Sequence, residues 1–141
     1  MRDFIQFVQV LFALIQFQIE LRLHGFQSVF PKYVNRYKTY KPITIEQHHV
    51  DRMFRLLRTI DKACALVPFK AECLHRSFLG FRFIRKKCSI PVDLVIGVKK
   101  FPFSAHAWLV LGDKNVNEDE SYTNQFLVMS LLHNFVLKPA S

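Results

Sequence analysis

The chain carries Cys73-Leu74-His75-Arg76-Ser77 at the start of a predicted helix, and this stretch decides the fold when taken with Ala105-His106-Ala107-Trp108 on a predicted strand. A cysteine in the first turn of a helix lies near the positive end of the helix dipole and near unpaired backbone N–H groups. Both favour the thiolate, and the same N–H groups can hold a developing oxyanion. A histidine on a facing strand can then act as the base for this thiol.

The half of the chain that follows Pro91 has the period of β-strands. Residues 92–98 alternate between apolar and other positions, which predicts a strand. Residues 100–103 form a predicted turn, 105–111 the next strand, Gly112-Asp113-Lys114 a hairpin turn and 115–117 a third short strand. The apolar segment 122–137 fits either a strand or a helix.

The preceding half has helical patterns. The predicted first helix covers 4–24 and ends at Gly25, and a short helix over 31–37 follows. Thr44 is the expected N-cap of a helix that extends to Leu66, with Gln47 completing a capping box. The expected apolar face of that helix consists of Val50, Met53, Phe54, Leu57, Ile60 and Cys64. A further helix is predicted over 72–86.

These elements predict an α+β fold, with N-terminal helices followed by an antiparallel sheet. With 141 residues, half of them hydrophobic, we expect one domain over 1–141: a helical part, 1–70, and a helix plus sheet, 71–141. The net charge of +9 is spread over three segments rather than one tract. Solvated helix faces are the first explanation of this charge, and attraction of an acidic peptide is the second. No RNA-binding or zinc-finger motif supports nucleic acid as a partner.

The apolar stretch 4–19 is shorter than the roughly 20 residues that span a bilayer. It fits a core helix, and its alternative is a docking surface for a partner protein or a membrane. A mild polar stripe follows one helical face: Arg2, Gln6, Gln9, Ala13, Gln16 and Glu20.

The cysteines indicate a cytoplasmic protein with free thiols, because they are odd in number, lack a CxxC pair and follow no signal peptide. Cys64 and Cys88 lack the helix-start position of Cys73 and are weaker candidates for a nucleophile. No cluster has metal-ligand spacing and no P-loop is present, so we expect neither a metal nor a cofactor.

Carboxylates follow the hairpin at Glu118 and Asp119, where either side chain could orient His106. The two would face opposite sides of a strand; spacing favours Glu118, whereas a bend would favour Asp119. His75 is next to Cys73 in sequence, but helical neighbours diverge by about 100°, so it is a poor candidate for the base. Trp108 is expected to pack against the helix. A helix-borne thiol, a strand-borne histidine and a carboxylate on the next strand form the pattern of transglutaminase and papain-like families.

The joint motif closely resembles the transglutaminase-like leader peptidases of lasso-peptide biosynthesis. The order and gaps match from Cys73 to about Glu118, where that family usually has Asp, whereas the helical half is similar only in general character. Because the chain begins with the peptidase part, it resembles the split form of that family. The matching stretches are Cys73-Leu74-His75-Arg76-Ser77-Phe78-Leu79, Leu94-Val95-Ile96-Gly97-Val98, Pro102-Phe103-Ser104-Ala105-His106-Ala107-Trp108 and Val116-Asn117-Glu118.

The resemblance implies a cytoplasmic cysteine peptidase with Cys73 as nucleophile, His106 as base and Glu118, or alternatively Asp119, as the third member. Its partners would be the precursor leader peptide, a separate leader-recognition protein and an asparagine-synthetase-like cyclase. Leaders of this family generally carry threonine at the second-last position, which implies a small specificity pocket. Two alternatives stay open: an acyl transferase using the same thioester, and a non-catalytic scaffold that docks through its apolar first helix.

Overall fold

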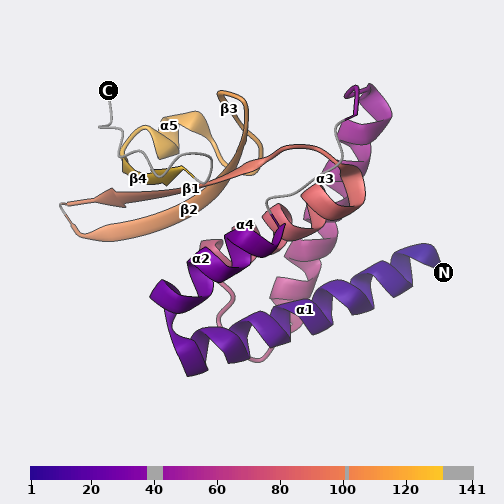
Figure 1. Ribbon diagram of the computed structural model, residues 1–141, viewed down its shortest axis with the longest axis horizontal. Helices are drawn as coiled ribbons and strands as arrows, with labels where there is room; N and C mark the ends of the chain where they lie inside the picture. The colour runs from indigo at the N-terminus through magenta and orange to yellow at the C-terminus, as the bar shows by residue number, and fades with distance from the viewer. Residues whose placement is uncertain (38–42, 101, 132–141) are drawn as a thin grey trace.

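The computed structural model describes residues 1–37, 43–100 and 102–131, and it has helices followed by a curled antiparallel sheet (Figure 1). This order confirms the predicted α+β class. The helices are α1 (Arg2–His24), α2 (Phe26–Tyr37), α3 (Gln47–Leu66), α4 (Cys73–Phe83) with its π-helical continuation η1 (Ile84–Cys88), and α5 (Glu120–Thr123). The strands are β1 (Asp93–Lys99), β2 (Ser104–Leu111), β3 (Lys114–Asn115) and β4 (Leu127–Leu131).

The sheet has the strand order β3-β2-β1-β4, and all its pairings are antiparallel. In the central pair, Gly97 of β1 lies opposite His106 of β2 and Ile96 lies opposite Ala107. The β1–β4 pairing contains an irregularity between Ile96 and Gly97. In Figure 1 the four long helices lie together on one side of the sheet, and α5 lies near β4 on the other.

Both faces of β2 are buried, but against different groups. Ala107 and Leu109 belong to the main core shared with the helices, whereas Trp108 and Val110 form a smaller cluster with Phe126. Alternation along the strand explains this division. The main core is tight where α4 meets β2: a Cβ added to Gly80 would lie 2.5 Å from the Leu109 side chain. Glycine at position 80 therefore allows the close approach of helix and sheet, and a larger residue would displace the Leu109 side chain.

Several helix boundaries differ from the prediction. Helix α2 begins at Phe26 instead of residue 31 and contains Pro31 in its interior. The loss of one backbone donor at this proline is outweighed by tertiary packing, since Phe30 and Tyr33 are buried against Phe78. The third predicted strand is two residues, 114–115, instead of 115–117. The apolar segment 122–137 divides between α5 and β4, and its residues 132–137 lie outside the described part.

The start of α3 also corrects the prediction. The N-cap is Glu46, not Thr44, and the capping box joins it to His49. The Glu46 carboxylate accepts the His49 backbone N–H, while Nδ1 of His49 accepts the Glu46 backbone N–H at 3.0 Å. The buried face consists of Met53, Leu56, Ile60 and Ala63. It is rotated from the predicted one because α3 packs between α1 and α4, which leaves Phe54 42% exposed.

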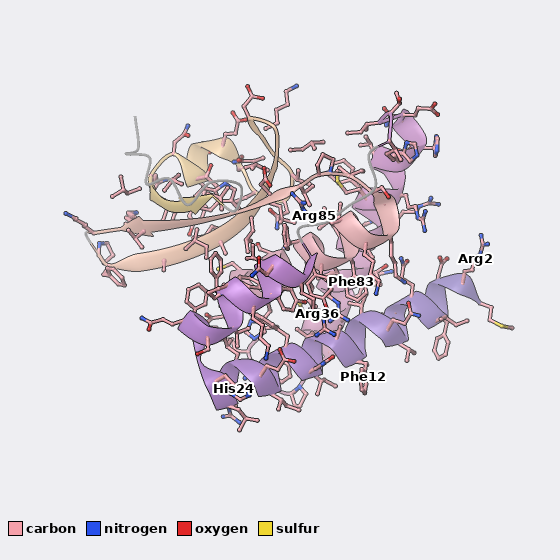
Figure 2. The ribbon with its side chains drawn as sticks, viewed as in Figure 1. Arg2, Phe12, His24, Arg36, Phe83 and Arg85 are labelled. Atoms are coloured by element: carbon pink, nitrogen blue, oxygen red, sulfur yellow. The ribbon has the colours of Figure 1, made fainter. Side chains whose placement is uncertain are left out.

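Helix α1 buries one side and exposes an apolar one. Ala13, assigned from the sequence to the polar stripe, is buried with Val10, Leu14 and Phe17, while Phe12 points away from the body of the molecule (Figure 2). The outward residues include Phe4, Val8, Phe12, Ile15, Ile19 and Leu23. At 23 residues the helix exceeds the predicted apolar stretch, and by length and composition alone it meets the requirements of a membrane span; 22% of its most apolar window is buried. The docking role of this face stays a prediction.

Candidate active site

The first turn of α4 holds Cys73 as its first residue, with Glu72 as the N-cap. The Glu72 carboxylate accepts the backbone N–H of His75, and Nδ1 of His75 accepts the backbone N–H of Glu72 at 3.1 Å. This capping box ties the residue before the cysteine to the residue two positions after it. The turn that carries the half-buried thiol is therefore held in one conformation.

Helix α4 covers the outer edge of β2, where β3 is too short to pair. Strand β3 pairs only with Val110 and Leu111, so the edge backbone near Ala107 requires other partners. The buried hydroxyl of Ser77 donates to the Ala107 carbonyl at 2.9 Å, and the Ala107 N–H donates to the Cys73 sulfur. Because Cys73 and Ser77 are four residues apart on one helix face, both bind the same peptide unit of the strand.

The thiol of Cys73 hydrogen-bonds to the imidazole of His106. Burial raises the pKa of the Cys73 thiol, but the bonds from His106 and from the Ala107 N–H, with the imidazolium charge, outweigh it and hold this pKa below its ordinary value. In turn, the bond to Cys73 raises the pKa of His106, against burial and with help from Glu118. The two shifts together favour a thiolate–imidazolium pair.

Glu118 engages the far side of the imidazole. Nε2 of His106 lies 2.8 Å from Oε2 of Glu118, and the two side chains are 12% and 26% exposed. With Glu118 at Nε2, the ring nitrogen left for the thiol is Nδ1. The structure thus brings Cys73, His106 and Glu118 into one hydrogen-bonded chain.

Asp119 caps helix α5 instead of orienting His106. Its carboxylate is the N-cap of α5 and accepts the N–H and O–H of Ser121, both at 2.8 Å. These bonds lower the pKa of Asp119, which is fully exposed. Neither Glu118 nor Asp119 lies on a strand, so the expected strand alternation does not separate them; the start of α5 does.

Asn117 fixes the loop that presents Glu118. Its Oδ1 accepts the backbone N–H of Leu109 at 2.8 Å, and its Nδ2 donates to Ser77 Oγ at 3.4 Å. The neighbouring Val116 N–H donates to the Leu109 carbonyl. One asparagine thereby joins the loop to both β2 and α4. The sequence motif included Asn117, but its spacing did not predict this bridging role.

Aromatic rings surround the imidazole of His106. Trp108 stacks on it at 5.9 Å between centroids, Phe126 lies at 5.6 Å and Tyr122 meets it edge-on at 5.1 Å. A Cβ added to Gly97 would lie 2.8 Å from both Trp108 and Phe126, so only glycine fits beneath these rings. Trp108 therefore packs against His106 and Phe126 in the smaller cluster, outside the main core that β2 shares with the helices, so its predicted packing against the helix is wrong.

Tyr122 and Phe126 were missed at the sequence level. Both lie in the apolar segment after Glu118, whose secondary structure the pattern left open. The available signal was their aromatic character four residues apart, which places them on one side of α5 and its continuation. The packing of α5 over β2 brings them to the imidazole.

The remaining cysteines and His75 are in different environments. Burial, with nearby Asp61, raises the pKa of Cys64 to about 11, and burial raises the pKa of Cys88 as well. Burial lowers the pKa of His75, whose Nε2 contacts Gln18 Oε1 at 2.6 Å while Nδ1 is occupied by the capping box. His75 is thus a neutral structural residue. Within residues 1–37, 43–100 and 102–131, no cluster suits a metal ion.

A hollow of about 310 Å³ borders this group of residues. Phe54, Leu57 and Ile60 give it an apolar side. Its polar lining includes Arg76 and Asn117, which follow Cys73 by three positions and precede Glu118 by one. Cys73 and His106 do not line it. The hollow therefore lies beside Arg76 and Asn117 rather than at the thiol and the imidazole themselves.

Comparison with protein families gives one match. The family described as the transglutaminase-like superfamily matches residues 13–131, from within α1 to the end of β4. No curated protein and no solved structure matches the chain.

Proposed function

The chain belongs to the transglutaminase-like superfamily, and on that premise we propose that it is a cysteine peptidase that removes the leader from a lasso-peptide precursor. The superfamily includes cysteine peptidases and acyl transferases, and its fold typically carries a cysteine-dependent enzyme. The observation that carries the proposal is the hydrogen-bonded chain from Cys73 through His106 to Glu118.

The chemistry begins with the Cys73 thiolate. Its sulfur attacks the carbonyl carbon of the last leader residue, while backbone N–H groups in the first turn of α4 stabilise the oxyanion. His106, as the imidazolium, gives its proton to the leaving amine, so the peptide C–N bond breaks and the core peptide departs. Glu118 keeps the ring oriented and stabilises its positive charge throughout.

Hydrolysis completes the cycle. His106, now neutral, takes a proton from a water molecule, whose oxygen attacks the thioester. The C–S bond breaks, the leader leaves with a free carboxylate, and the proton on His106 again pairs with the thiolate. The aromatic rings around His106 limit its motion, which keeps one geometry for both steps.

The choice of peptidase over acyl transferase rests on the motif of residues 73–118, which resembles the lasso leader peptidases. The apolar side of the hollow at Phe54 and Leu57 suits apolar side chains of the leader. The proposal includes a cytoplasmic location, a separate leader-recognition protein and an asparagine-synthetase-like cyclase. The recognition protein would deliver the precursor, and the cyclase would use the freed core amine.

The test is a reconstituted cleavage assay with a leader-containing precursor and its recognition protein, followed by mass spectrometry. We expect two fragments whose masses sum to the precursor plus one water. The Cys73→Ala variant should lose more than about 10³-fold in rate, because the nucleophile is gone. The matched Cys64→Ala variant should stay within about twofold of the parent, because Cys64 is not in contact with His106.

Other outcomes decide between the alternatives. A crosslinked product that lacks the added water assigns an acyl transferase that uses the same thioester. Equal losses in the two cysteine variants overturn the choice of nucleophile. Full processing by Cys73→Ala leaves only the scaffold role, for which the exposed apolar face of α1 is the observation in favour.

A further inference from the structure

A second, larger hollow of about 840 Å³ lies between the N-terminal part of α1 and one side of α3. We call it the basic groove, and the lining includes one carboxylate, Asp3. Its cationic lining residues are Arg2, Arg52, Arg55, Arg58, Lys62 and Lys87. This concentration of positive charge accounts for much of the excess that the sequence carries.

Among the described residues, carboxylates do not pair with the cations of the basic groove. Across the described part of the chain, none of its six cations forms an ion pair. Lys87 donates only to the neutral amide of Gln9, and burial together with the charges of Arg52 and Lys86 lowers its pKa. Like charges held in one concavity repel one another and raise the local potential. An anionic ligand would relieve that repulsion.

The helical repeat of α3 produces this surface. Arg52, Arg55 and Lys62 recur at intervals of three and seven residues, so they share a side that the buried face of α3 does not include. The span from residue 52 to 62 is about 15 Å along the helix axis. An extended peptide covers that length with about five residues. The row of cations therefore matches a short acidic stretch of polypeptide.

The basic groove shares one lining residue with the smaller hollow. Arg58 lines both this groove and the smaller hollow. The smaller hollow in turn reaches Arg76 and Asn117, which are near Cys73 and Glu118 in sequence. A single extended chain could thus pass from the reacting bond, over α3 at Arg58, into the basic groove.

We propose that the basic groove is a secondary binding site for an acidic segment of the polypeptide substrate, distant from the bond that is cleaved. This inference rests on the proposed peptidase function for its link to the reaction. Its occupant is a peptide because the groove is concave, its cations follow α3 over the length of a short extended segment, and it shares Arg58 with the hollow that Arg76 and Asn117 line. A flat bilayer fits less well: Figure 2 shows Arg2 and Phe12 pointing to different sides of α1, so one plane does not meet both the cations and the apolar face.

Binding is tested first, without turnover, on the full chain carrying Cys73→Ala. The probe is a fluorescein-labelled peptide of ten residues alternating Glu and Gly, measured by anisotropy. The groove variant combines Arg52→Glu, Arg55→Glu and Lys62→Glu. The control variant combines Arg22→Glu, Lys32→Glu and Lys114→Glu, which change the net charge equally at exposed positions outside both hollows.

We expect the groove variant to weaken binding by at least about tenfold and the control variant by less than about threefold. Equal losses in the two variants would mean general charge attraction and overturn the proposal. So would tighter binding of the parent protein to a single-stranded oligonucleotide of equal charge, or to phosphatidylglycerol vesicles. If the groove variant does not fold by circular dichroism, Arg52→Gln with Arg55→Gln replaces it, and an unchanged affinity overturns the proposal.

Kinetics then separate this inference from the proposed function. For a precursor with an acidic leader segment, the groove variant built on active Cys73 should raise KM about tenfold and leave kcat and the alkylation rate of Cys73 unchanged. Unchanged KM with intact cleavage rejects the groove and keeps the peptidase. Groove-dependent binding of the peptide without any cleavage by the parent enzyme rejects the peptidase and keeps the groove.

Discussion

Histidine and cysteine each occur in this molecule in two environments that move their pKa values in opposite directions. Where α4 meets α1, His75 is neutral, both of its ring nitrogens are engaged, and it serves as a helix cap. Where α4 meets β2, His106 has a raised pKa and joins a thiol to a carboxylate. Cys64 and Cys73 differ in the same way, with pKa values moved in opposite directions. The comparison teaches that the partners of a residue, more than its type, decide its chemistry.

The largest expected effect separates the two histidines. His106→Ala removes the base and the main partner of the Cys73 thiolate, so cleavage should fall by about 10³- to 10⁴-fold. Alkylation of Cys73 by iodoacetamide at neutral pH should slow as well, because the thiol pKa rises. His75→Ala should keep the parent pH profile and lose about 1–2 kcal/mol of unfolding free energy, because a cap and a hydrogen bond are lost. A normal alkylation rate in His106→Ala would contradict the pairing.

The second largest expected effect is a change in the pH dependence of kcat/KM, which tests the role of Glu118. The reactive thiolate–imidazolium pair exists above the lowered pKa of Cys73 and below the raised pKa of His106, so kcat/KM should rise through the first and fall through the second. Glu118→Gln removes a group that raises the His106 pKa, so the alkaline limb should move to lower pH and the rate should drop by about 10²-fold.

The control for this measurement is Asp119→Asn. Asparagine is also a good N-cap, so α5 should keep its start, and Asp119 does not contact His106. Its alkaline limb should coincide with that of the parent protein. A shift of the same size in both variants would mean that the overall charge near the site, rather than the Glu118 contact, sets the pKa of His106.

The smallest expected effect concerns how the two regions are joined. Ser77→Ala removes the buried hydroxyl that donates to Ala107, leaving that carbonyl unpaired, and should cost about 1–3 kcal/mol of unfolding free energy in urea. Ser121→Ala, which loses an exposed bond to Asp119, is the matched control and should cost about 0.5 kcal/mol or less. If the two variants lose the same stability, the Ser77 bond does not join α4 to β2 as described.

Much of the fold was predictable because it depends on short-range rules. Alternation identified β1 and β2, and Gly25 marked the end of α1. The helix-start position of Cys73 followed from the local pattern as well. The N-cap of α3 was assigned wrongly because the local rule favours Thr44, whereas in the structure Glu46 and His49 form the capping box.

The sequence by itself determined the α+β order of elements and the place of Cys73 and His106 on a helix and a strand, because periodicity and turn chemistry act over a few residues. Only the tertiary structure decided that α4 covers the edge of β2, that Glu118 meets His106 while Asp119 caps α5, and that Trp108 stacks on the imidazole. It also gathered the dispersed cations of α1 and α3 into one groove. Each of these depends on contacts between segments far apart in the chain, which are set by the docking of whole helices and strands rather than by local preference.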